Sequence, residues 1–180
     1  MTITWKDIKQ VPISEYCICV DIDQVKDTVQ RYIDTHHLNL NPWFQRGHVW
    51  TMEQRVKYME HLLHGNQSAN IIMFNKPYWM KWSKKEHHDL EMTIIDGLQR
   101  LTTVLMFVED KLEVFGQVCS QFGSLRLCPV SLKFAISSII DEKELVEWYL
   151  RLNSAGTIHT EEELQRVKSR LYNGEGSDEQ

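Results

Sequence analysis

The strongest chemical signal in the sequence lies between Thr93 and Thr103, which reads T-I-I-D-G-L-Q-R-L-T-T. The apolar residues predict a strand, and the Asp-Gly pair predicts a tight turn directly into a helix. The first turn of a helix has unpaired backbone N–H groups at the positive end of the helix dipole, where an anion is stabilised. Arg100, one turn into the helix, can add a bidentate contact to a phosphate. The junction is therefore a candidate anion site, with the hydroxyls of Thr102 and Thr103 as further donors.

The same spacing also fits a structural role. Asp96 can cap the helix, with Gln99 three residues later closing a capping box, and Arg100 can pair with a surface carboxylate. Because Asp-Gly is common before a helix, the residues alone leave both interpretations open.

A second candidate is the loop from Asn41 to Trp50, N-P-W-F-Q-R-G-H-V-W. Pro42 forces the residue before it to be extended, which predicts a loop or strand edge. Aromatic side chains around an arginine suit stacking on a nucleotide ring, with Arg46 on phosphate. The alternative is that the same aromatic side chains anchor the loop on the core.

A third candidate is the loop from Arg151 to Thr160, R-L-N-S-A-G-T-I-H-T, which is predicted to join two helices. Its small residues allow the backbone to approach a ligand closely, and Asn153, Thr157 and His159 offer donors or a titrating imidazole. The structural alternative is a simple connector that ends in a helix cap.

A hairpin arm is predicted at residues 76–91, between strands at 70–75 and 92–95 that would be neighbours. Its Trp and Lys side chains suit contact with a phosphate backbone or a protein, although a solvated hairpin tip is the simpler interpretation. Adjacent His87 and His88 point apart on an extended chain, which disfavours a metal site.

Short strands and about five helices are predicted to position these loops, which indicates the α+β class. We expect one folded domain at 1–172 and a disordered acidic tail at 173–180. The predicted elements are a strand at 16–20, helices at 23–36 and 51–64, the strands named above, a long helix from Leu98 to Phe115, strand structure within 125–137, and helices at 141–152 and 160–172.

Composition narrows the class of protein. The chain has 180 residues, 42% hydrophobic, with 20 basic against 25 acidic residues and a net charge of -5, so nucleic-acid binding driven by overall charge is excluded. It has no membrane-spanning apolar run and no apparent leader, so we expect a cytoplasmic protein. Cys17 and Cys19 alternate in a strand, and we expect all four thiols to be reduced and mostly buried.

Three motifs follow one another in a defined order along the chain. They are P-W-F-Q-R followed by V-W, then I-I-D-G-L-Q-R-L-T-T, then N-x-x-G-T-x-H-T-x-E-E-L. Together they resemble the DGQQR-signature domain of modification-dependent, GmrSD-type restriction proteins, within the ParB/sulfiredoxin-like superfamily. The resemblance runs from about Pro42 to Arg166.

This resemblance implies a ParB/sulfiredoxin-like fold, a small mixed sheet with surrounding helices that forms a nucleotide pocket. It implies a nucleoside triphosphate and Mg²⁺ as cofactors, with Asp96 orienting the metal or a water and Arg46 and Arg100 offsetting phosphate charge. Asn153, Thr157 and His159 would close the pocket. Catalytic roles are expected for Asp96, Gln99 and Gln45, and cofactor contacts for Arg46, Gly97, Arg100, Thr102, Asn153, Thr157 and His159.

Two departures from the family pattern leave two functions open. Leu98 replaces the first Gln of D-G-Q-Q-R, which would slow hydrolysis if that amide positions water. The resemblance also implies a C-terminal HNH-type nuclease region, which full restriction proteins of this type usually carry. The segment after Glu163 is too short for such a region, so we expect a standalone unit from a phage or mobile element. One hypothesis is an NTP-binding domain that hydrolyses NTP or transfers phosphate and acts with DNA. The other is an inactive protein that binds or inhibits a protein partner; a homodimer is compatible with both.

Overall fold

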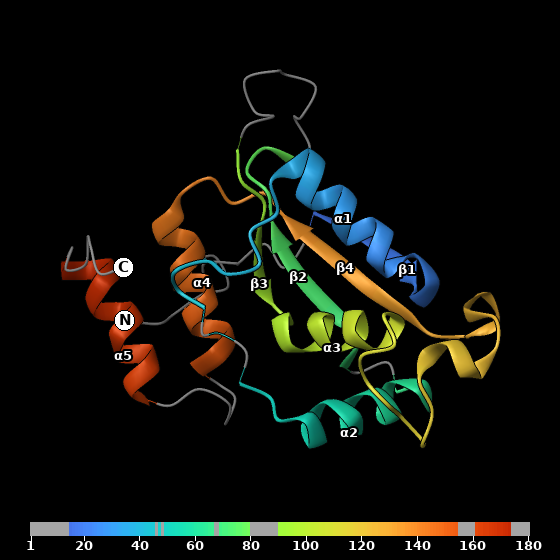
Figure 1. Ribbon diagram of the computed structural model, residues 1–180. Coiled ribbons are helices and arrows are strands. Elements are labelled where there is room, and N and C mark those ends of the chain that lie inside the picture. Colours follow the sequence, from blue (N-terminus) through green and yellow to red (C-terminus); the bar gives the residue numbers. More distant parts are fainter. Residues whose placement is uncertain are drawn as a thin grey trace, which may run out of the picture.

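A four-stranded mixed sheet forms the centre of the protein, with strand order β1-β4-β2-β3 (Figure 1). β1 and β4 are antiparallel, β4 and β2 are parallel, and β2 and β3 are antiparallel. The strands are β1 (Tyr16–Asp21), β2 (Ile71–Asn75), β3 (Thr93–Asp96) and β4 (Ser131–Ser137). The computed structural model describes residues 15–45, 47, 49–66, 69–79, 90–154 and 161–173.

Five α-helices surround the sheet in this described part of the chain, which confirms the predicted α+β class. They are α1 (Val25–His36), α2 (Met52–Leu63), α3 (Leu98–Val108), α4 (Glu142–Ser154) and α5 (Glu161–Asn173). Short 3-10 turns occupy Ile22–Gln24, Cys119–Phe122 and Leu125–Leu127. None of the described helices combines the length and apolar character that a membrane crossing requires.

The two faces of the sheet bury different apolar clusters. Side chains alternate along a strand, so Ile94 of β3 packs in the cluster with α1 and α3, whereas Ile95 packs in the cluster with α4. Phe74 and Phe134 are fully buried on the first face, with ring centroids 5.1 Å apart. The alternation thus places β3 between α3 on one face and α4 on the other.

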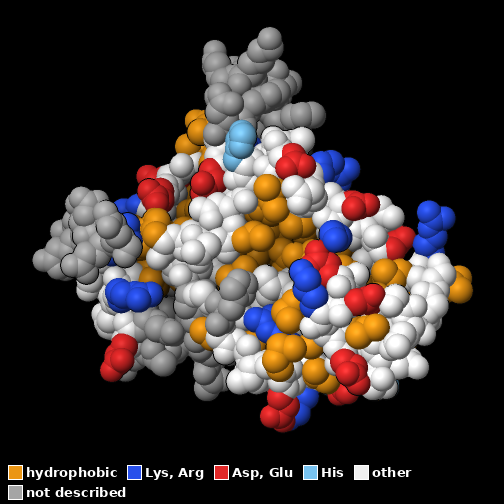
Figure 2. Space-filling view, viewed as in Figure 1, with side chains coloured by type: hydrophobic (Ala, Val, Ile, Leu, Met, Phe, Trp, Pro, Cys, Tyr) orange, Lys and Arg blue, Asp and Glu red, His pale blue; other side chains and the backbone are white. Residues whose placement is uncertain are grey.

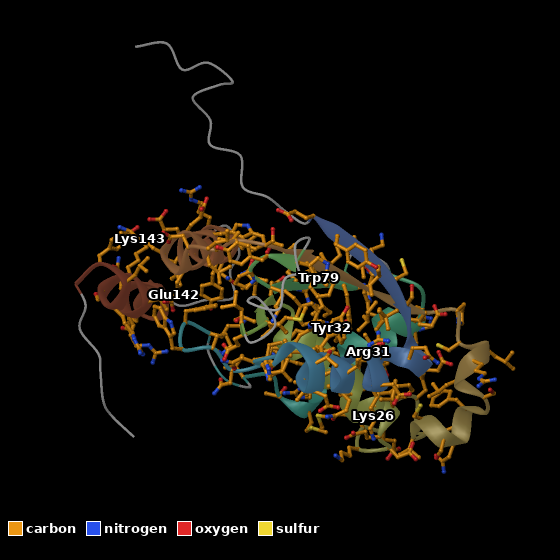
Figure 3. All side chains as sticks on the ribbon, turned by 90° about the horizontal axis from the view of Figure 1, so that it is seen from above. Lys26, Arg31, Tyr32, Trp79, Glu142 and Lys143 are labelled. Carbon is orange, nitrogen blue, oxygen red and sulfur yellow. The ribbon has the colours of Figure 1, made fainter. Side chains whose placement is uncertain are left out.

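The predicted hairpin pairing of β2 with β3 is confirmed, and residues 80–89 of its arm lie outside the described residues. At the base of the arm, Trp79 packs against Tyr32 of α1 with ring centroids 6.3 Å apart (Figure 3). The neighbouring Lys76 is buried and donates a hydrogen bond to the Leu90 carbonyl. These contacts join the two ends of the arm to α1 and to each other.

The predicted helix from Leu98 to Phe115 is wrong after Val108, where α3 ends. Asp110 adopts a left-handed conformation with φ 58°, and the Lys111 N–H donates back to the Met106 carbonyl at 2.8 Å. This C-terminal turn satisfies carbonyls that the helix leaves unpaired. Beyond this point Leu112 keeps the predicted spacing but reaches the same core from a loop, together with Val114, whereas Phe115 is exposed.

All four cysteines are free, but the expectation of mostly buried thiols is wrong for Cys17 and Cys19. β1 is an edge strand, and the face that carries these two side chains is exposed. Cys119 is buried, and burial raises the pKa of its thiol. Charge does not gather on the face shown in Figure 2, where acidic and basic side chains are interspersed around a central group of hydrophobic ones.

Helix α4 is held by contacts to α5 and to the 41–45 loop. Trp43 Nε1 donates to Glu142 Oε1 at 2.8 Å, and the Arg170 guanidinium lies 4.6 Å from the Trp43 ring centre. The Tyr172 hydroxyl hydrogen-bonds Glu147 Oε1 at 3.0 Å. Since α4 carries pocket residues described below, these contacts help to position one wall of the pocket.

Candidate functional site

The turn between β3 and α3 depends on Gly97. This residue is the helix N-cap, with φ 96° and ψ 13°, a conformation that side-chain-bearing residues rarely adopt. A Cβ at Gly97 would lie 2.8 Å from Ile72 Cδ1 and 3.3 Å from the Ile71 carbonyl oxygen. The alternative in which Asp96 caps the helix is wrong, because the N-cap residue is Gly97, which has no side chain to accept a capping hydrogen bond.

The Asp96 carboxylate instead forms an ion pair with Arg100 Nη2, one helical turn away. The two side chains are 40% and 21% exposed, so the pair is open to solvent on one side. A partly exposed ion pair contributes little to stability, and its members remain able to exchange partners. The structure therefore places an accessible carboxylate and an accessible guanidinium at the start of α3.

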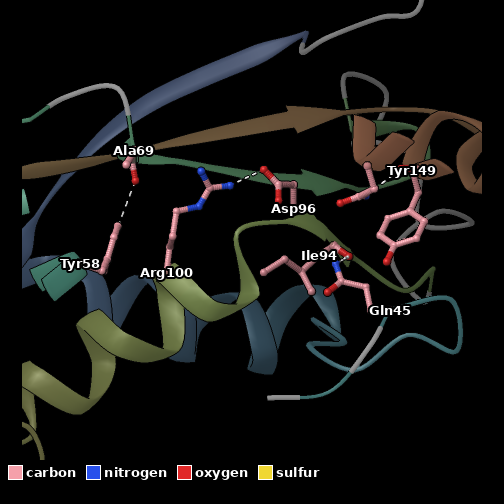
Figure 4. Close-up of polar contacts among 8 residues, drawn as sticks. Gln45, Tyr58, Ala69, Ile94, Asp96, Arg100 and Tyr149 are labelled. Atoms are coloured by element: carbon pink, nitrogen blue, oxygen red, sulfur yellow. Dashed lines mark hydrogen bonds and ion pairs between the residues drawn. The ribbon is translucent and has the colours of Figure 1, made fainter. Parts of the chain in front are cut away.

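A cavity of about 480 Å³ lies beside this pair. Its volume falls within the range of about 300–1,000 Å³ usual for small-molecule sites. Figure 4 shows the Asp96–Arg100 pair between Tyr58 on one side and Gln45 and Tyr149 on the other. The cavity is lined by Gln45, Trp50, Tyr58, Ala69, Ile95, Asp96, Gly97, Leu98, Gln99, Arg100, Tyr149, Leu152 and Asn153.

Gln45 reaches the cavity from the 41–45 loop. Its Nε2 donates to the Ile94 carbonyl at 3.0 Å, which attaches the loop to β3. The neighbouring Phe44 is 4% exposed and is a core anchor, as the structural interpretation of this loop predicts, whereas Trp50 forms part of the cavity wall. One aromatic segment therefore provides both an anchor and a wall.

Gln99 joins α3 to the chain just before α2. Its Oε1 accepts hydrogen bonds from the Val49 and Trp50 N–H groups, each at 3.3 Å, and its Nε2 donates to the Gly47 carbonyl at 2.9 Å. The amide that we expected to be catalytic is thus engaged by backbone groups. In this arrangement Gln99 fixes the wall that contains Trp50.

The remaining predicted residues fall into three groups. Asn153 lines the cavity, and its Nδ2 donates to the Tyr149 carbonyl within α4 at 2.8 Å. Thr102 is not among the lining residues, and its hydroxyl donates to the Leu98 carbonyl at 2.8 Å. The predicted residues Arg46, Thr157 and His159 lie outside the described residues.

Tyr58 and Tyr149, which form opposite walls of the cavity, were not predicted from the sequence. Both lie on helix faces that also carry core residues, so their spacing resembles that of ordinary packing positions. The Tyr58 hydroxyl donates to the Ala69 carbonyl at 3.1 Å. A phenol on a core-facing side of a helix was the available signal, since a buried hydroxyl needs a polar partner.

The pKa of Tyr58 supplies a test of this geometry. Burial raises it from 10.0 to about 12, with Arg100 opposing part of the rise. Between about pH 10 and 12 the unfolded chain loses this proton while the folded protein retains it. We expect the free energy of unfolding to fall by at most about 1.4 kcal/mol per pH unit there because of Tyr58. Urea unfolding of wild type and Tyr58→Phe should show a shallower decline in the variant; equal slopes would contradict this assignment.

The described residues contain no group of three or more His, Cys, Asp or Glu side chains placed to hold a metal ion. Among the described lining residues Asp96 is the one carboxylate. Mg²⁺ is commonly held by one or two carboxylates together with substrate phosphates and water. Asp96 therefore fits a metal that arrives with a phosphate ligand better than a resident protein-bound metal.

The fold and cavity define a class of protein: an α+β domain with a small-molecule-sized pocket at a strand-to-helix junction. The family model for the N-terminal domain of the GmrSD restriction endonuclease matches residues 25–126, more than half of the chain. The chain belongs to this family, which associates it with restriction systems. Neither the curated proteins nor the solved structures contain a match.

Proposed function

We propose that this domain binds a nucleoside triphosphate in the cavity beside Asp96 and Arg100 and acts with DNA in a restriction system. The observation that carries the proposal is the glycine turn that brings Asp96, Arg100 and the N-terminus of α3 to one wall of a 480 Å³ cavity. Unpaired N–H groups and an arginine suit a phosphate group. A likeness to ParB-type CTP-binding proteins stays a prediction.

Aromatic side chains provide the surface for the rest of the ligand. Trp50 and Tyr58 lie together, with ring centroids 5.3 Å apart, and Tyr149 lies on the opposite wall. Planar bases stack favourably on aromatic rings. The cavity thus combines a surface on which a planar ring can stack with an ionic centre, as a nucleotide requires.

The ion pair would rearrange when a phosphate group binds. Arg100 would move from Asp96 to phosphate oxygens, because a guanidinium binds phosphate through two parallel hydrogen bonds. Asp96 would then be free to hold Mg²⁺, which supplies charge neutralisation for the phosphates when bound. Gln45 Oε1 has no hydrogen-bond partner among the described residues, so it can accept a hydrogen bond from a ligand or water.

A nucleotide panel tests the proposal directly. Calorimetry with ATP, GTP, CTP and UTP in the presence of Mg²⁺ should show binding of at least one, and phosphate release should show whether the bound nucleotide is hydrolysed. Binding without phosphate release would indicate a sensor. Absence of binding to all four would reject the proposal and favour the alternative of a protein that binds a protein partner.

Leu98 gives a separate prediction about hydrolysis. It lines the cavity but is only 5% exposed, with its side chain in the core. If the missing amide limits turnover, Leu98→Gln should increase phosphate release while lowering stability by about 1–3 kcal/mol, because a polar group becomes buried. Leu98→Met is the control that conserves volume without adding an amide. Turnover in Leu98→Gln no higher than in Leu98→Met would reject this explanation.

A further inference from the structure

Arg55 is a buried cation directly behind the cavity. It lies on α2, and 6% of its surface is exposed. Its Nη1 donates to Thr102 Oγ1 at 3.2 Å and to Thr103 Oγ1 at 3.0 Å. Its Nη2 donates to Gln99 Oε1 at 3.4 Å. The guanidinium therefore bridges α2 to the motif helix α3.

The three acceptors of Arg55 are neutral, and no carboxylate pairs with it among the described residues. Arg100 differs, because its charge is balanced by Asp96. Burial lowers the pKa of Arg55, but a guanidinium remains charged at neutral pH. A charge with little water around it is weakly screened, so an anion in the adjacent cavity would feel it.

The hydrogen-bond network holds this charge in place. The hydroxyl of Thr102 donates to the Leu98 carbonyl at 2.8 Å, and that of Thr103 donates to the Gln99 carbonyl at 2.7 Å. Each hydroxyl proton is thus directed away from Arg55, which leaves an oxygen lone pair facing it. Gln99, the third acceptor, lines the cavity and separates the guanidinium from it.

We propose, on the basis of the nucleotide site proposed above, that Arg55 is a positioning residue whose buried positive charge holds the polyphosphate part of the ligand across Gln99. Arg55 contributes attraction without direct contact. A bound polyphosphate supplies the negative charge that the surrounding protein does not provide. The effect therefore depends on the charge of the ligand and on the charge at position 55.

Inorganic tripolyphosphate is the probe, since it carries charge and has no base or sugar. We expect Arg55→Gln to weaken its binding about tenfold, which corresponds to about 1.4 kcal/mol. Arg55→Lys should stay within about threefold of wild type, because it keeps the charge. Lys57→Gln is the matched control: it removes one charge from the exposed face of the same helix, where Lys57 pairs with Glu53, and should change affinity less than twofold.

A second variant adds the opposite charge without changing Arg55. Thr102→Asp places a carboxylate beside Nη1, outside the cavity lining, and should cause a similar tenfold loss even if Arg55→Gln fails to fold. Thermal unfolding of each variant establishes that it is folded. Unfolding of both variants would also overturn the proposal, because Arg55 would then be a structural requirement of the core.

The remaining outcomes separate this inference from the proposed function. Equal losses in Arg55→Gln and Arg55→Lys would overturn it, because the guanidinium geometry and not the charge would matter. Unchanged binding in Arg55→Gln or Thr102→Asp would also overturn it. If wild type binds neither tripolyphosphate nor any of the four nucleotides, the proposed function itself fails.

Discussion

Replacing Arg100 by alanine should weaken nucleotide binding about 100-fold, the largest functional effect that we expect from a single substitution. Arg100 is the one cation among the described residues that line the cavity. Removing it eliminates a charge-assisted contact to phosphate and leaves Asp96 to repel the ligand. A 100-fold loss corresponds to about 2.7 kcal/mol. Calorimetric titration of wild type and Arg100→Ala measures it.

Arg31 provides the matched control, because it is an exposed arginine on α1 (Figure 3). Arg31→Ala should bind nucleotide as wild type does. Asp96→Asn tests the other half of the pair: without Mg²⁺ it should bind more tightly than wild type, because repulsion is removed and Arg100 is released. Nucleotide affinity that is unchanged in Arg100→Ala would show that the ligand does not occupy this cavity.

Replacing Gly97 by alanine should cause the largest structural effect, a loss of about 3 kcal/mol in the free energy of unfolding. The positive φ accounts for part of this loss, and the contact of the new Cβ with Ile72 Cδ1 adds to it. The turn would also shift, so Asp96 and Arg100 would no longer face the cavity together. We therefore expect nucleotide binding to be lost along with stability, as measured by urea unfolding and calorimetry.

Gly65 offers a control for the backbone conformation alone. It has φ 84°, and an added Cβ would meet nothing within 4 Å. Gly65→Ala should therefore destabilise the protein by only about 1 kcal/mol and leave binding unchanged. If both alanine variants lose the same stability, the close approach to Ile72 does not contribute and our account of the turn is wrong.

Local sequence signals predicted most of the elements for identifiable reasons. The helix predicted at 51–64 is present as α2, and Thr51 and Gln54 make both hydrogen bonds of a capping box at its start. The apolar runs predicted β2, β3 and their pairing. The prediction failed where a local pattern has two structural solutions: Leu112 continues the apolar spacing of α3, but it reaches the core from a loop.

The candidate site was only partly predictable from the sequence, because each polar side chain has several possible hydrogen-bond partners in the fold. The D-G-L-Q-R motif indicated an anion site, and Gln45 and Arg100 line the same cavity. The motif did not indicate that Gln99 binds the backbone at Gly47, Val49 and Trp50. That role depends on where the segment before α2 crosses α3, which involves residues about 50 positions apart.

The sequence by itself determined the helices and strands, the strand-to-helix turn at Gly97 and the family of this protein, because these depend on residues close together in the chain. Only the tertiary structure decided which side chains form the walls of the cavity beside that turn. Tyr58 from α2 and Tyr149 from α4 meet around Asp96 and Arg100 because the two faces of the sheet bury separate clusters. Arg55 lies behind the cavity because helix α2 packs on helix α3. Packing between distant segments satisfies burial and hydrogen bonding together, and no local pattern specifies that arrangement.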